Sequence, residues 1–213
     1  LNHATMTKYS YQFKIVIESM LLVCLVFLLR AGHVSAAATW TEVTSIDPKK
    51  WLDITSSADG TKLAAVGLTL AGGATNIWTS SDSGRTWTNV TSIGAKKKWY
   101  CITSSADGTK LAAGVYGGNI WTSNNSGANW TEVTTTGATR NWRGITSSED
   151  GTKLAAVVLD GDIWTSSNSG ATWTSTSVGA TKKWQRITSS ANGTELAACT
   201  KSWSSGENIW ISS

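Results

Sequence analysis

Residues 76–87 read Asn-Ile-Trp-Thr-Ser-Ser-Asp-Ser-Gly-Arg-Thr-Trp, and this stretch decides the fold because the chain repeats it. Copies with the same pattern occupy residues 119–130 and 162–173, and a fourth begins at residue 208. A pattern that returns at a regular spacing indicates an architecture built from stacked copies of one unit. The organisation of the chain is therefore set by its repeat.

The second half of the stretch has the composition of a tight hairpin turn. The side chain of Asp82, and of Asn125 and Asn168 in the later copies, can accept backbone N–H bonds across such a turn. Gly84 and its equivalents can take a positive φ without penalty. The Trp that follows opens the next strand, and its ring can fold beneath the turn. These features predict an architecture and not a reaction.

Ser80, Asp82, Gly84, Thr86 and Trp87 match every defined position of the signature Ser-x-Asp-x-Gly-x-Thr-Trp. In these residues the chain resembles the Asp-box (BNR) β-propellers of the sialidase-like and sortilin-like superfamily, which also resemble xyloglucanases and photosystem-assembly factors. The later copies present Ser123, Asn125, Gly127 and Trp130, then Ser166, Asn168, Gly170, Thr172 and Trp173. An amide still accepts a hydrogen bond, so we expect these turns to persist without the charge. The resemblance implies that the motif is structural and distant from any active face.

Each repeat also contains Trp-x-x-Ile-Thr-Ser-Ser, then Asp-Gly or Asn-Gly, then Leu-Ala-Ala. The Ile residues of this pattern, of which Ile102 and Ile145 are two, recur about 43 residues apart, the length of one propeller blade. Asp-Gly or Asn-Gly between two apolar runs is a strong hairpin signal. Each unit is therefore predicted to form four short antiparallel strands, A to D, with tight A–B and C–D turns. The predicted fold class is all-β, a β-propeller of four-stranded antiparallel blades.

The predicted blades cover about 51–91, 99–134, 142–177 and 184–213, and residues 39–44 are predicted to be a lone strand D. Two arrangements follow from this count. In one, four blades close a ring when residues 39–44 complete the last blade. In the other, which we favour because the sequence stops inside a motif, the blades belong to a larger ring. A partial ring exposes an apolar blade face, so we expect it to self-associate.

Residues 1–38 have the pattern of a secretory signal peptide. Lys8 and Lys14 precede an apolar run at 20–29, and small residues follow at 34–38. The run is shorter than the roughly 20 residues that span a bilayer. We therefore expect a protein that is secreted, or exported to a periplasm or lumen, with no stable membrane span after cleavage.

The charge and the composition exclude several classes of site. Removing Lys8, Lys14 and Arg30 from 18 basic residues, and Glu18 from 14 acidic ones, leaves 15 against 13. This balance is too mild to predict a nucleic-acid partner. Both histidines lie within residues 1–38 and there is no Cys-x-x-Cys, so we expect no metal, no cofactor and no His-based catalytic group.

Twelve of the thirteen tryptophans fall into three repeat positions. These are the start of strand A (Trp51, Trp99, Trp142, Trp184), strand C (Trp78, Trp121, Trp164, Trp210) and the start of strand D (Trp40, Trp87, Trp130, Trp173). A blade lies between two neighbours, so both faces of its sheet are buried. Burying one indole contributes about 2–3 kcal/mol, which makes these rings the expected source of cohesion.

Specificity is expected on the face that carries the D–A and B–C loops, because the opposite face holds only regular turns. The candidate ligand-binding residues are Lys50, Trp51, Lys97, Lys98, Trp99, Arg140, Trp142, Arg143, Lys183, Trp184 and Arg186. Cations beside indoles suit an anionic or sugar ligand, through charge and stacking. The plainer alternative is that the lysines are solvated loop charges and the indoles belong to the core.

No residue is assigned a catalytic role. The Arg-Ile-Pro motif that a sialidase resemblance would require is absent, and Tyr100 and Tyr116 have no evident Glu partner. Asp53, Asp160 and Asp162 are the carboxylates available for a glycosidase pair, and none recurs among the repeats. The sequence favours a secreted non-catalytic scaffold that binds a glycan or an extracellular protein. The alternatives are a fragment of a sialidase-like or xyloglucanase-like hydrolase and a propeller like the photosystem-assembly factors.

Overall fold

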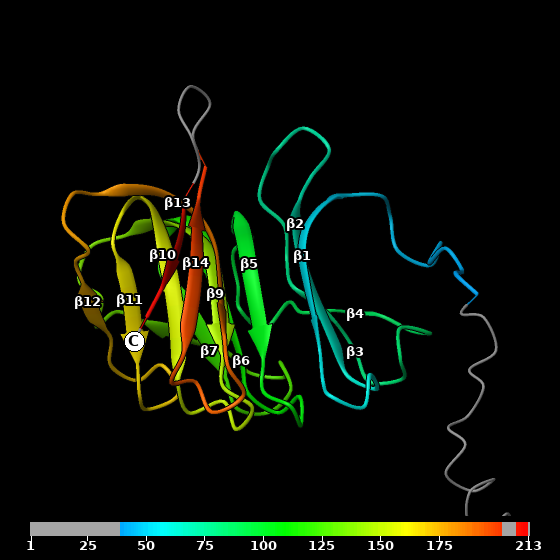
Figure 1. The fold of residues 1–213 in the computed structure, drawn as a ribbon. Helices are drawn as coiled ribbons and strands as arrows, with labels where there is room; N and C mark the ends of the chain where they lie inside the picture. The colour runs from blue at the N-terminus through cyan, green and yellow to red at the C-terminus, as the bar shows by residue number, and fades with distance from the viewer. Residues whose placement is uncertain (1–38, 202–207, 213) are drawn as a thin grey trace, which may run out of the picture. The chain divides into compact units, whose positions relative to one another are not determined.

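The computed structural model describes residues 39–201 and 208–212, and these residues form antiparallel strands without any helix (Figure 1). The all-β prediction is therefore confirmed. The predicted signal peptide lies outside the described residues. Within them, no helix is long and apolar enough to cross a membrane.

Each predicted repeat forms one antiparallel sheet, which we call a blade. Blade 1 contains β1 (Lys50–Ser56), β2 (Leu63–Leu68), β3 (Trp78–Ser80) and β4 (Thr88–Asn89). Blade 2 contains β5 (Trp99–Ser104), β6 (Leu111–Gly118), β7 (Ile120–Ser123) and β8 (Thr131–Val133). Blade 3 contains β9 (Arg140–Ser147), β10 (Leu154–Gly161), β11 (Ile163–Ser166) and β12 (Thr174–Thr176). Blade 4 has three described strands, β13 (Lys182–Ser189), β14 (Leu196–Thr200) and β15 (Ile209–Ile211).

Residues 39–44 form no strand, contrary to the sequence prediction. The chain divides into two compact units, Leu1–Glu42 and Val43–Ser213, and this segment spans the boundary between them. The Trp40 side chain is 97% exposed. A strand needs a hydrogen-bonded neighbour, and the segment pairs with no described strand.

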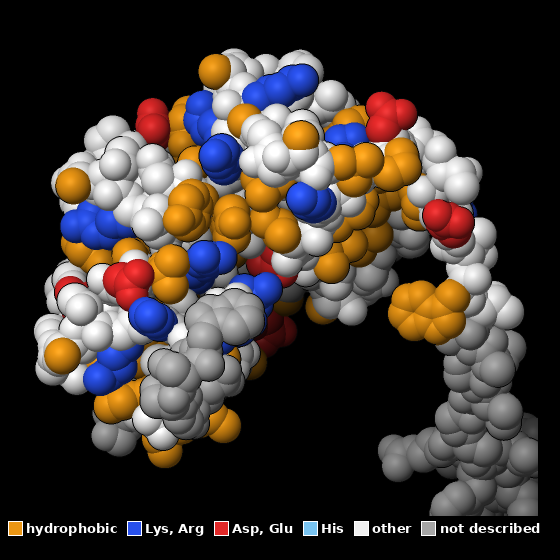
Figure 2. All heavy atoms as spheres, turned by 90° about the horizontal axis from the view of Figure 1, so that it is seen from above, with side chains coloured by type: hydrophobic (Ala, Val, Ile, Leu, Met, Phe, Trp, Pro, Cys, Tyr) orange, Lys and Arg blue, Asp and Glu red, His pale blue; other side chains and the backbone are white. Residues whose placement is uncertain are grey.

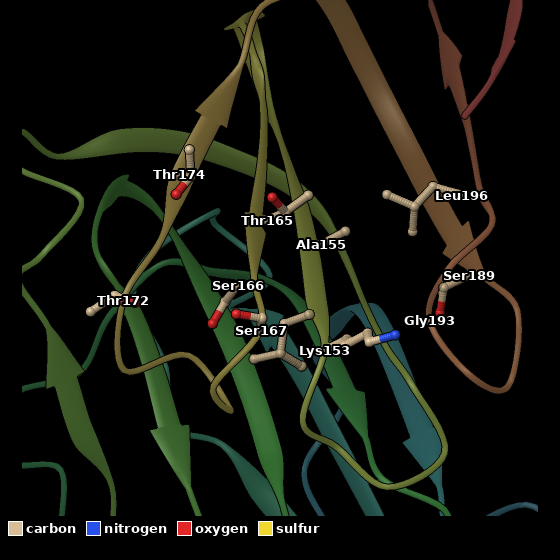
Figure 3. Close-up of a pocket in the computed structure, with 11 residues that line it drawn as sticks. Lys153, Ala155, Thr165, Ser166, Ser167, Thr172, Thr174, Ser189, Gly193 and Leu196 are labelled. Carbon is tan, nitrogen blue, oxygen red and sulfur yellow. The ribbon is translucent and has the colours of Figure 1, made fainter. Parts of the chain in front are cut away.

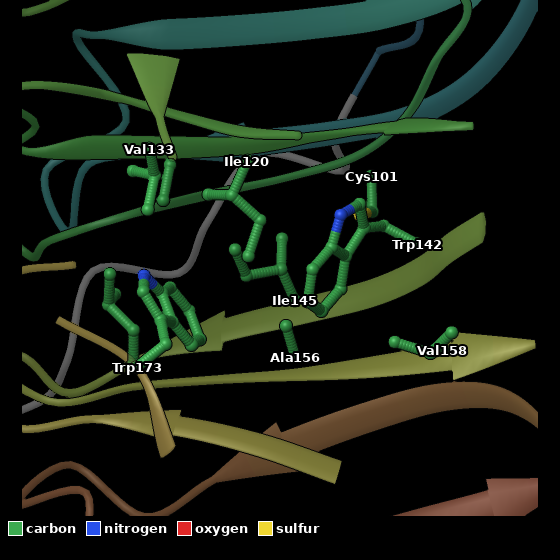
Figure 4. Close-up of a cluster of buried hydrophobic side chains, with 10 residues drawn as sticks. Cys101, Ile120, Val133, Trp142, Ile145, Ala156, Val158 and Trp173 are labelled. Carbon is green, nitrogen blue, oxygen red and sulfur yellow. The ribbon is translucent and has the colours of Figure 1, made fainter. Parts of the chain in front are cut away.

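The hydrophobic core consists of three clusters, and each lies between two successive blades. Figure 4 shows the cluster between blades 2 and 3, in which Ile120 and Val133 of blade 2 face Trp142, Ile145 and Trp173 of blade 3. Each blade therefore has a first face, which carries its indoles and the Ile of its first strand, and a second face, which carries the Ile before its strand-C indole. The second face of one blade packs on the first face of the next.

Backbone hydrogen bonds also join successive blades. The A–B turns are linked in a row, because Ala58 N–H donates to Ala106 O, Ala106 N–H to Glu149 O and Glu149 N–H to the Ala191 carbonyl, each at 2.7 Å. On the opposite side, the first residue of strand A pairs with the end of strand B of the preceding blade in blades 3 and 4, as Arg140 does with Gly118, and Lys97 before β5 pairs with Thr75 of blade 1. Neighbouring blades are thus fastened at both ends as well as through their cores.

The motif turns, residues 80–87, 123–130 and 166–173, have the geometry that their composition predicts. The Asp82 carboxylate accepts from the backbone N–H of Thr86 at 2.9 Å, and the Asn125 amide oxygen accepts from Asn129 N–H at the same distance. Gly84 and Gly127 have φ of +83° and +86°. The Trp87 indole N–H donates to Gly84 O at 3.0 Å, so the ring lies against its own turn.

Candidate functional site

Three of the predicted ligand-binding indoles belong to the core, which corrects the sequence prediction. Trp99, Trp142 and Trp184 are between 0 and 1% exposed. The indole N–H of Trp142 donates to Gly118 O of the preceding blade at 3.1 Å, and that of Trp184 donates to Gly161 O at the same distance. A ring that is enclosed and fully hydrogen-bonded cannot stack on a ligand. Trp51 alone in this position remains open, at 39% exposed.

Two of the predicted binding cations also have a structural role. The residue two positions before each strand-A indole lies over the strand-C indole of its own blade: Lys49 on Trp78, Lys97 on Trp121, Arg140 on Trp164 and Lys182 on Trp210, at 4.9, 4.7, 4.2 and 4.5 Å from the ring centroid. Distances below about 6 Å allow a favourable cation–π interaction. Lys97 and Arg140 therefore stabilise the blades and are not free for a ligand.

The remaining predicted residues differ in their surroundings. Lys50, Lys98 and Lys183 are exposed. Arg186 is also exposed, and its guanidinium donates to the backbone carbonyls of Arg143 and Gln185 at 3.1 and 3.0 Å. Arg143 is half-buried and, unlike Lys97 and Arg140, lies over tyrosine rings. Of these residues, Arg143 and Lys183 lie together, because both line one pocket between blades 3 and 4.

A β-bulge follows the strand-A indole in every blade, because the pairing register shifts there between positions such as Trp99 and Cys101. Such bulges redirect a side chain and are over-represented beside functional sites. The bulge residues are Leu52, Tyr100, Arg143 and Gln185, four different residue types, and the position after them also differs among the blades. The blades therefore differ from one another at this position.

Tyr100, Tyr116 and Arg143 form a cluster between blades 2 and 3. The two tyrosine rings lie 5.0 Å apart with an interplanar angle of 31°. The Arg143 guanidinium lies over both rings, at 4.7 Å from the centroid of Tyr100 and 5.3 Å from that of Tyr116. No other blade has a Tyr in these positions. We call Tyr100, Tyr116, Arg143 and Gln185 the tyrosine–arginine strip.

The strip continues into a pocket between blades 3 and 4 with a volume of about 280 Å³. Its lining residues are Arg143, Leu159, Asp160, Lys183, Gln185 and Lys201. Asp160 has a φ of +55°, and the equivalent residue of blade 2 is Gly117 with a φ of +71°. Asp adopts this conformation more readily than most residues, and Ser83, Ser126 and Ser169 have φ of +56° to +60° in the motif turns, so the value does not by itself mark a site. The Asp160 side chain shares the pocket with Arg143, Lys183 and Lys201.

The other two carboxylates considered for catalysis have structural partners. Burial raises the pKa of Asp53, and hydrogen bonds from backbone N–H groups oppose that rise. Those donors are Ile102 N–H of the next blade, at 2.9 Å from Oδ2, and Ile54 N–H, at 3.1 Å from Oδ1. Asp162 accepts from the Ser175 hydroxyl at 2.9 Å. Both side chains hold strands together, and Asp160 is the one acid that lines the pocket.

Figure 2 shows Lys and Arg side chains scattered between hydrophobic groups on the face that bears the D–A and B–C loops. The opposite face also has pockets. The one in Figure 3, with a volume of about 220 Å³, is lined by hydroxyls such as Thr165 and Ser166 and by Leu196. An equivalent pocket of about 330 Å³ lies between blades 2 and 3. Because it recurs with the repeat, this pocket follows from blade packing and does not mark a unique site.

No family model and no curated protein sequence matches the chain. Solved structures match it in fold. The GH74 enzyme from Niastella koreensis gives a TM-score of 0.61 at 18% identity, over 76% of this chain and 28% of that one. YCF48 bound to D1 peptide gives 0.57 at 18%, over 76% and 51%, and hydrazine synthase from Kuenenia stuttgartiensis gives 0.60 at 14%, over 84% and 49%.

These neighbours are all β-propellers, so the chain has a propeller-like fold. It spans about half of the length of two of them and less of the third. At these low identities the likeness shows the fold alone, and membership of the Asp-box superfamily stays a prediction.

Sequence reasoning did not assign Tyr100, Tyr116, Leu159, Asp160 or Gln185 to the site. The signal was present in the repeats, because the two positions after the strand-A indole differ in every copy while the indole and the following Ile recur. The residues that recur in every repeat form the core, since they make the packing contacts that each pair of blades needs. The residues that differ among the blades line the candidate site.

Proposed function

We propose that the chain is a secreted, non-catalytic binding scaffold whose ligand, an acidic glycan, lies along the tyrosine–arginine strip and enters the adjoining pocket. The observation that carries this proposal is the cluster of Tyr100, Tyr116 and Arg143, which occurs once in a fold that otherwise repeats itself. The uniform blades form the scaffold, and the tyrosine–arginine strip with its adjoining pocket provides the selectivity.

The chemistry of the strip favours an acceptor-rich, negatively charged ligand. Phenol hydroxyls, a guanidinium, the Gln185 amide and the Lys183 ammonium offer many donors, whereas Asp160 is a single acid. Guanidinium groups bind carboxylates in a bidentate manner, and tyrosine rings pack against sugars and peptides at low entropic cost. A peptide is the second ligand class, because YCF48 bound to D1 peptide has a similar fold, and the cations of the strip favour an acidic one.

The proposal is tested on arrays of acidic glycans and acidic peptides, with variants taken from the repeat itself. Tyr116→Leu, Arg143→Gln and Asp160→Gly each install the residue of a neighbouring blade, so the fold is expected to persist. We expect Tyr116→Leu and Arg143→Gln each to lower affinity by about tenfold or more, because one charge-assisted or stacking contact contributes 1–3 kcal/mol. Lys50→Gln, an exposed cation outside the strip, is the matched control. Unchanged binding by both strip variants would refute the proposal.

A glycoside hydrolase is the second candidate, because GH74 enzymes are among the structural neighbours. Glycoside hydrolysis uses two carboxyl groups that flank the scissile bond. The pocket has one, Asp160, and Asp53 is occupied by backbone donors. A reducing-sugar assay on xyloglucan separates the two functions: we expect no release above that of Asp160→Asn. Hydrolysis that this variant abolishes would replace binding with catalysis.

A further inference from the structure

Asp160, the acid that lines the pocket between blades 3 and 4, has a carboxylate that the fold does not use. The side chain is exposed and accepts no hydrogen bond from any residue in the described parts of the chain. The pairing register between β10 and β13 shifts between Leu159 and Gly161, so Asp160 is the extra residue of a β-bulge. The equivalent bulge residue of blade 2 is Gly117, which has no side chain. The carboxylate is therefore not required for the backbone to take this path.

Blade 2 shows where a side chain at this bulge position points. A Cβ added to Gly117 would have Oδ1 of Asn141 as its nearest atom, at 3.9 Å. Lys183 takes the place of Asn141 at the next junction, because it pairs with Leu159 as Asn141 pairs with Tyr116. The pocket therefore sets a group that only accepts hydrogen bonds beside the Lys183 ammonium, which only donates them.

This arrangement suits a ligand that combines one negative charge with hydrogen-bond donors. Guanidinium and ammonium groups bind a carboxylate, whereas the Asp160 carboxylate needs a donor from the ligand. A uronate ring carries both, because hydroxyl groups lie on the ring that bears its carboxylate. The pocket volume of about 280 Å³ is near the lower end of the usual range for ligand pockets, which suits one sugar ring. A sulfate ester in place of those hydroxyls would remove the donors and bring a second negative charge against Asp160.

We propose that Asp160 determines the specificity of the site: it selects a uronate ring whose hydroxyl groups are free and rejects a ring whose hydroxyl groups carry sulfate. This role rests on the proposed function, since it requires an acidic glycan in the pocket. In the complex, the ligand carboxylate lies against Arg143 and Lys183, and hydroxyl groups of the same ring donate to Asp160. The cations supply affinity for any acidic sugar, and the single acid distinguishes one acidic sugar from another.

Fluorescence anisotropy with labelled tetramers of galacturonate, either unsubstituted, O-acetylated or O-sulfated, tests this role at about 0.15 M salt. We expect the wild type to bind the unsubstituted tetramer about tenfold more tightly than the acetylated one, because acetylation leaves Asp160 without a donor. The ratio of Kd for the sulfated tetramer to Kd for the unsubstituted one is compared between variants, which removes the general attraction of a more highly charged ligand. Asp160→Gly should lower this ratio by on the order of tenfold. Asp160→Asn keeps an acceptor oxygen without the charge, so it should still bind the unsubstituted tetramer and should bind the sulfated one more tightly than the wild type does.

Asp162→Asn is the matched control, because it removes a negative charge two residues away and installs Asn119, the residue of blade 2. We expect it to bind all three tetramers as the wild type does. Near-ultraviolet circular dichroism of the buried indoles confirms that the variants are folded.

The outcomes separate this role from the proposed function. If Arg143→Gln weakens binding of all three tetramers but Asp160→Gly leaves the ratio unchanged, the strip binds acidic glycans and the role of Asp160 is overturned. An equal change of the ratio in Asp162→Asn would also overturn it, since net charge alone would then explain the preference. Failure of the wild type to bind any tetramer would overturn it as well, and binding on the arrays of acidic glycans then decides the proposed function separately.

Discussion

Blade 1 and blade 2 carry almost the same pattern of residues and bury them to different extents. Ile102 is 3% exposed and Trp99 1%, whereas Ile54 is 62% exposed and Trp51 39%. The difference is the preceding blade, which blade 2 has and blade 1 lacks among the described residues. Burial in this fold is therefore a property of the junction between two blades and not of the single blade.

The local chemistry, by contrast, is the same in both blades. In the A–B turn of blade 1 the Asp59 carboxylate accepts from the Ser57 hydroxyl at 2.6 Å and from Thr61 N–H at 3.0 Å. In blade 2 the Asp107 carboxylate accepts from its corresponding Ser and Thr at 2.6 and 2.9 Å. Turn geometry thus depends on neighbours in sequence, and cohesion depends on neighbouring blades, as expected for a repeat protein.

The largest test of this comparison is the deletion of one indole from each kind of blade. Trp142→Ala leaves a cavity in the core between blades 2 and 3 and an unpaired carbonyl at Gly118, so it should lower the free energy of unfolding by about 3–5 kcal/mol. Trp51→Ala removes a ring that is already partly in water and should cost about 1 kcal/mol or less. Urea unfolding followed by circular dichroism measures both. Equal losses for the two variants would contradict the view that the junctions between blades carry the stability.

Substitution of the motif-turn glycines should give a smaller difference in stability between blades 1 and 2. Gly84 and Gly127 both have φ above +80°, so Ala at either site costs about 1–2 kcal/mol. At Gly127 a Cβ would also lie 2.9 Å from Cγ2 of Thr79 in the preceding blade. At Gly84 the nearest atom is Cδ1 of Leu63, in the same blade, at 3.2 Å. We expect Gly127→Ala to be about 1 kcal/mol worse than Gly84→Ala in urea unfolding. Equal costs would show that Thr79 moves aside.

The fold could be predicted because the residues that form each turn are close together in the sequence of each repeat. Asp-Gly pairs and the motif turns fix where strands end, and their spacing gives one sheet per unit. The strand predicted at 39–44 was wrong because that prediction used only the local residue pattern. Residues 40–43 read Trp-Thr-Glu-Val, the same as residues 130–133, but the latter pair with β7 and the former with no described strand. Strand formation requires a partner, and a local pattern cannot supply one.

The site was only partly predictable. Proximity of cations to indoles was expected, yet the sequence does not show which ring each cation meets. Lys97 lies two residues before Trp99 but over Trp121, because the strand-C ring lies beside the incoming loop. The contact between Tyr100 and Arg143 crosses from one blade to the next. It depends on the β-bulges and the stacking of blades, neither of which a single repeat specifies.

Removal of the cation over a strand-C indole should have an effect of intermediate size. Arg140→Gln loses a contact with Trp164 and two hydrogen bonds to the carbonyls of Thr136 and Ala138, so we expect a loss of about 1–2 kcal/mol. Lys49→Gln, at the open blade, should cost about 0.5 kcal/mol, because water competes there. Thermal unfolding at two salt concentrations measures both losses. A larger loss of stability for Lys49→Gln than for Arg140→Gln would contradict the expectation that this contact contributes less at the open blade.

The smallest expected effect concerns the motif turn at residues 80–87, in which the hydrogen-bond acceptor is the carboxylate of Asp82. The hydroxyl and the backbone N–H of Thr86 lower the pKa of Asp82 to about 2, whereas Asn125 and Asn168 hold the same turns without a charge. A carboxyl whose pKa is lowered by folding contributes stability that is complete above its unfolded value of about 3.9. That contribution is lost as the pH falls through about 2. Asp82→Asn should therefore be less stable than wild type at pH 6, by an amount that shrinks steadily between pH 4 and pH 2.

Asp59, Asp107 and Asp150 also have pKa values lowered to about 2, so the wild type loses stability in acid for several reasons at once. Subtracting the unfolding curves of Asp82→Asn and wild type at each pH cancels those shared contributions and isolates one carboxylate. Asn125→Asp provides the reverse comparison in blade 2, where the Ser123 hydroxyl still donates to residue 125 but Asn129 replaces the Thr, so the new charge has one hydroxyl donor fewer than Asp82. Its pH dependence should be weaker than that of Asp82. A difference between Asp82→Asn and wild type that stays constant down to pH 2 would mean that the Asp82 hydrogen bonds do not depend on its charge.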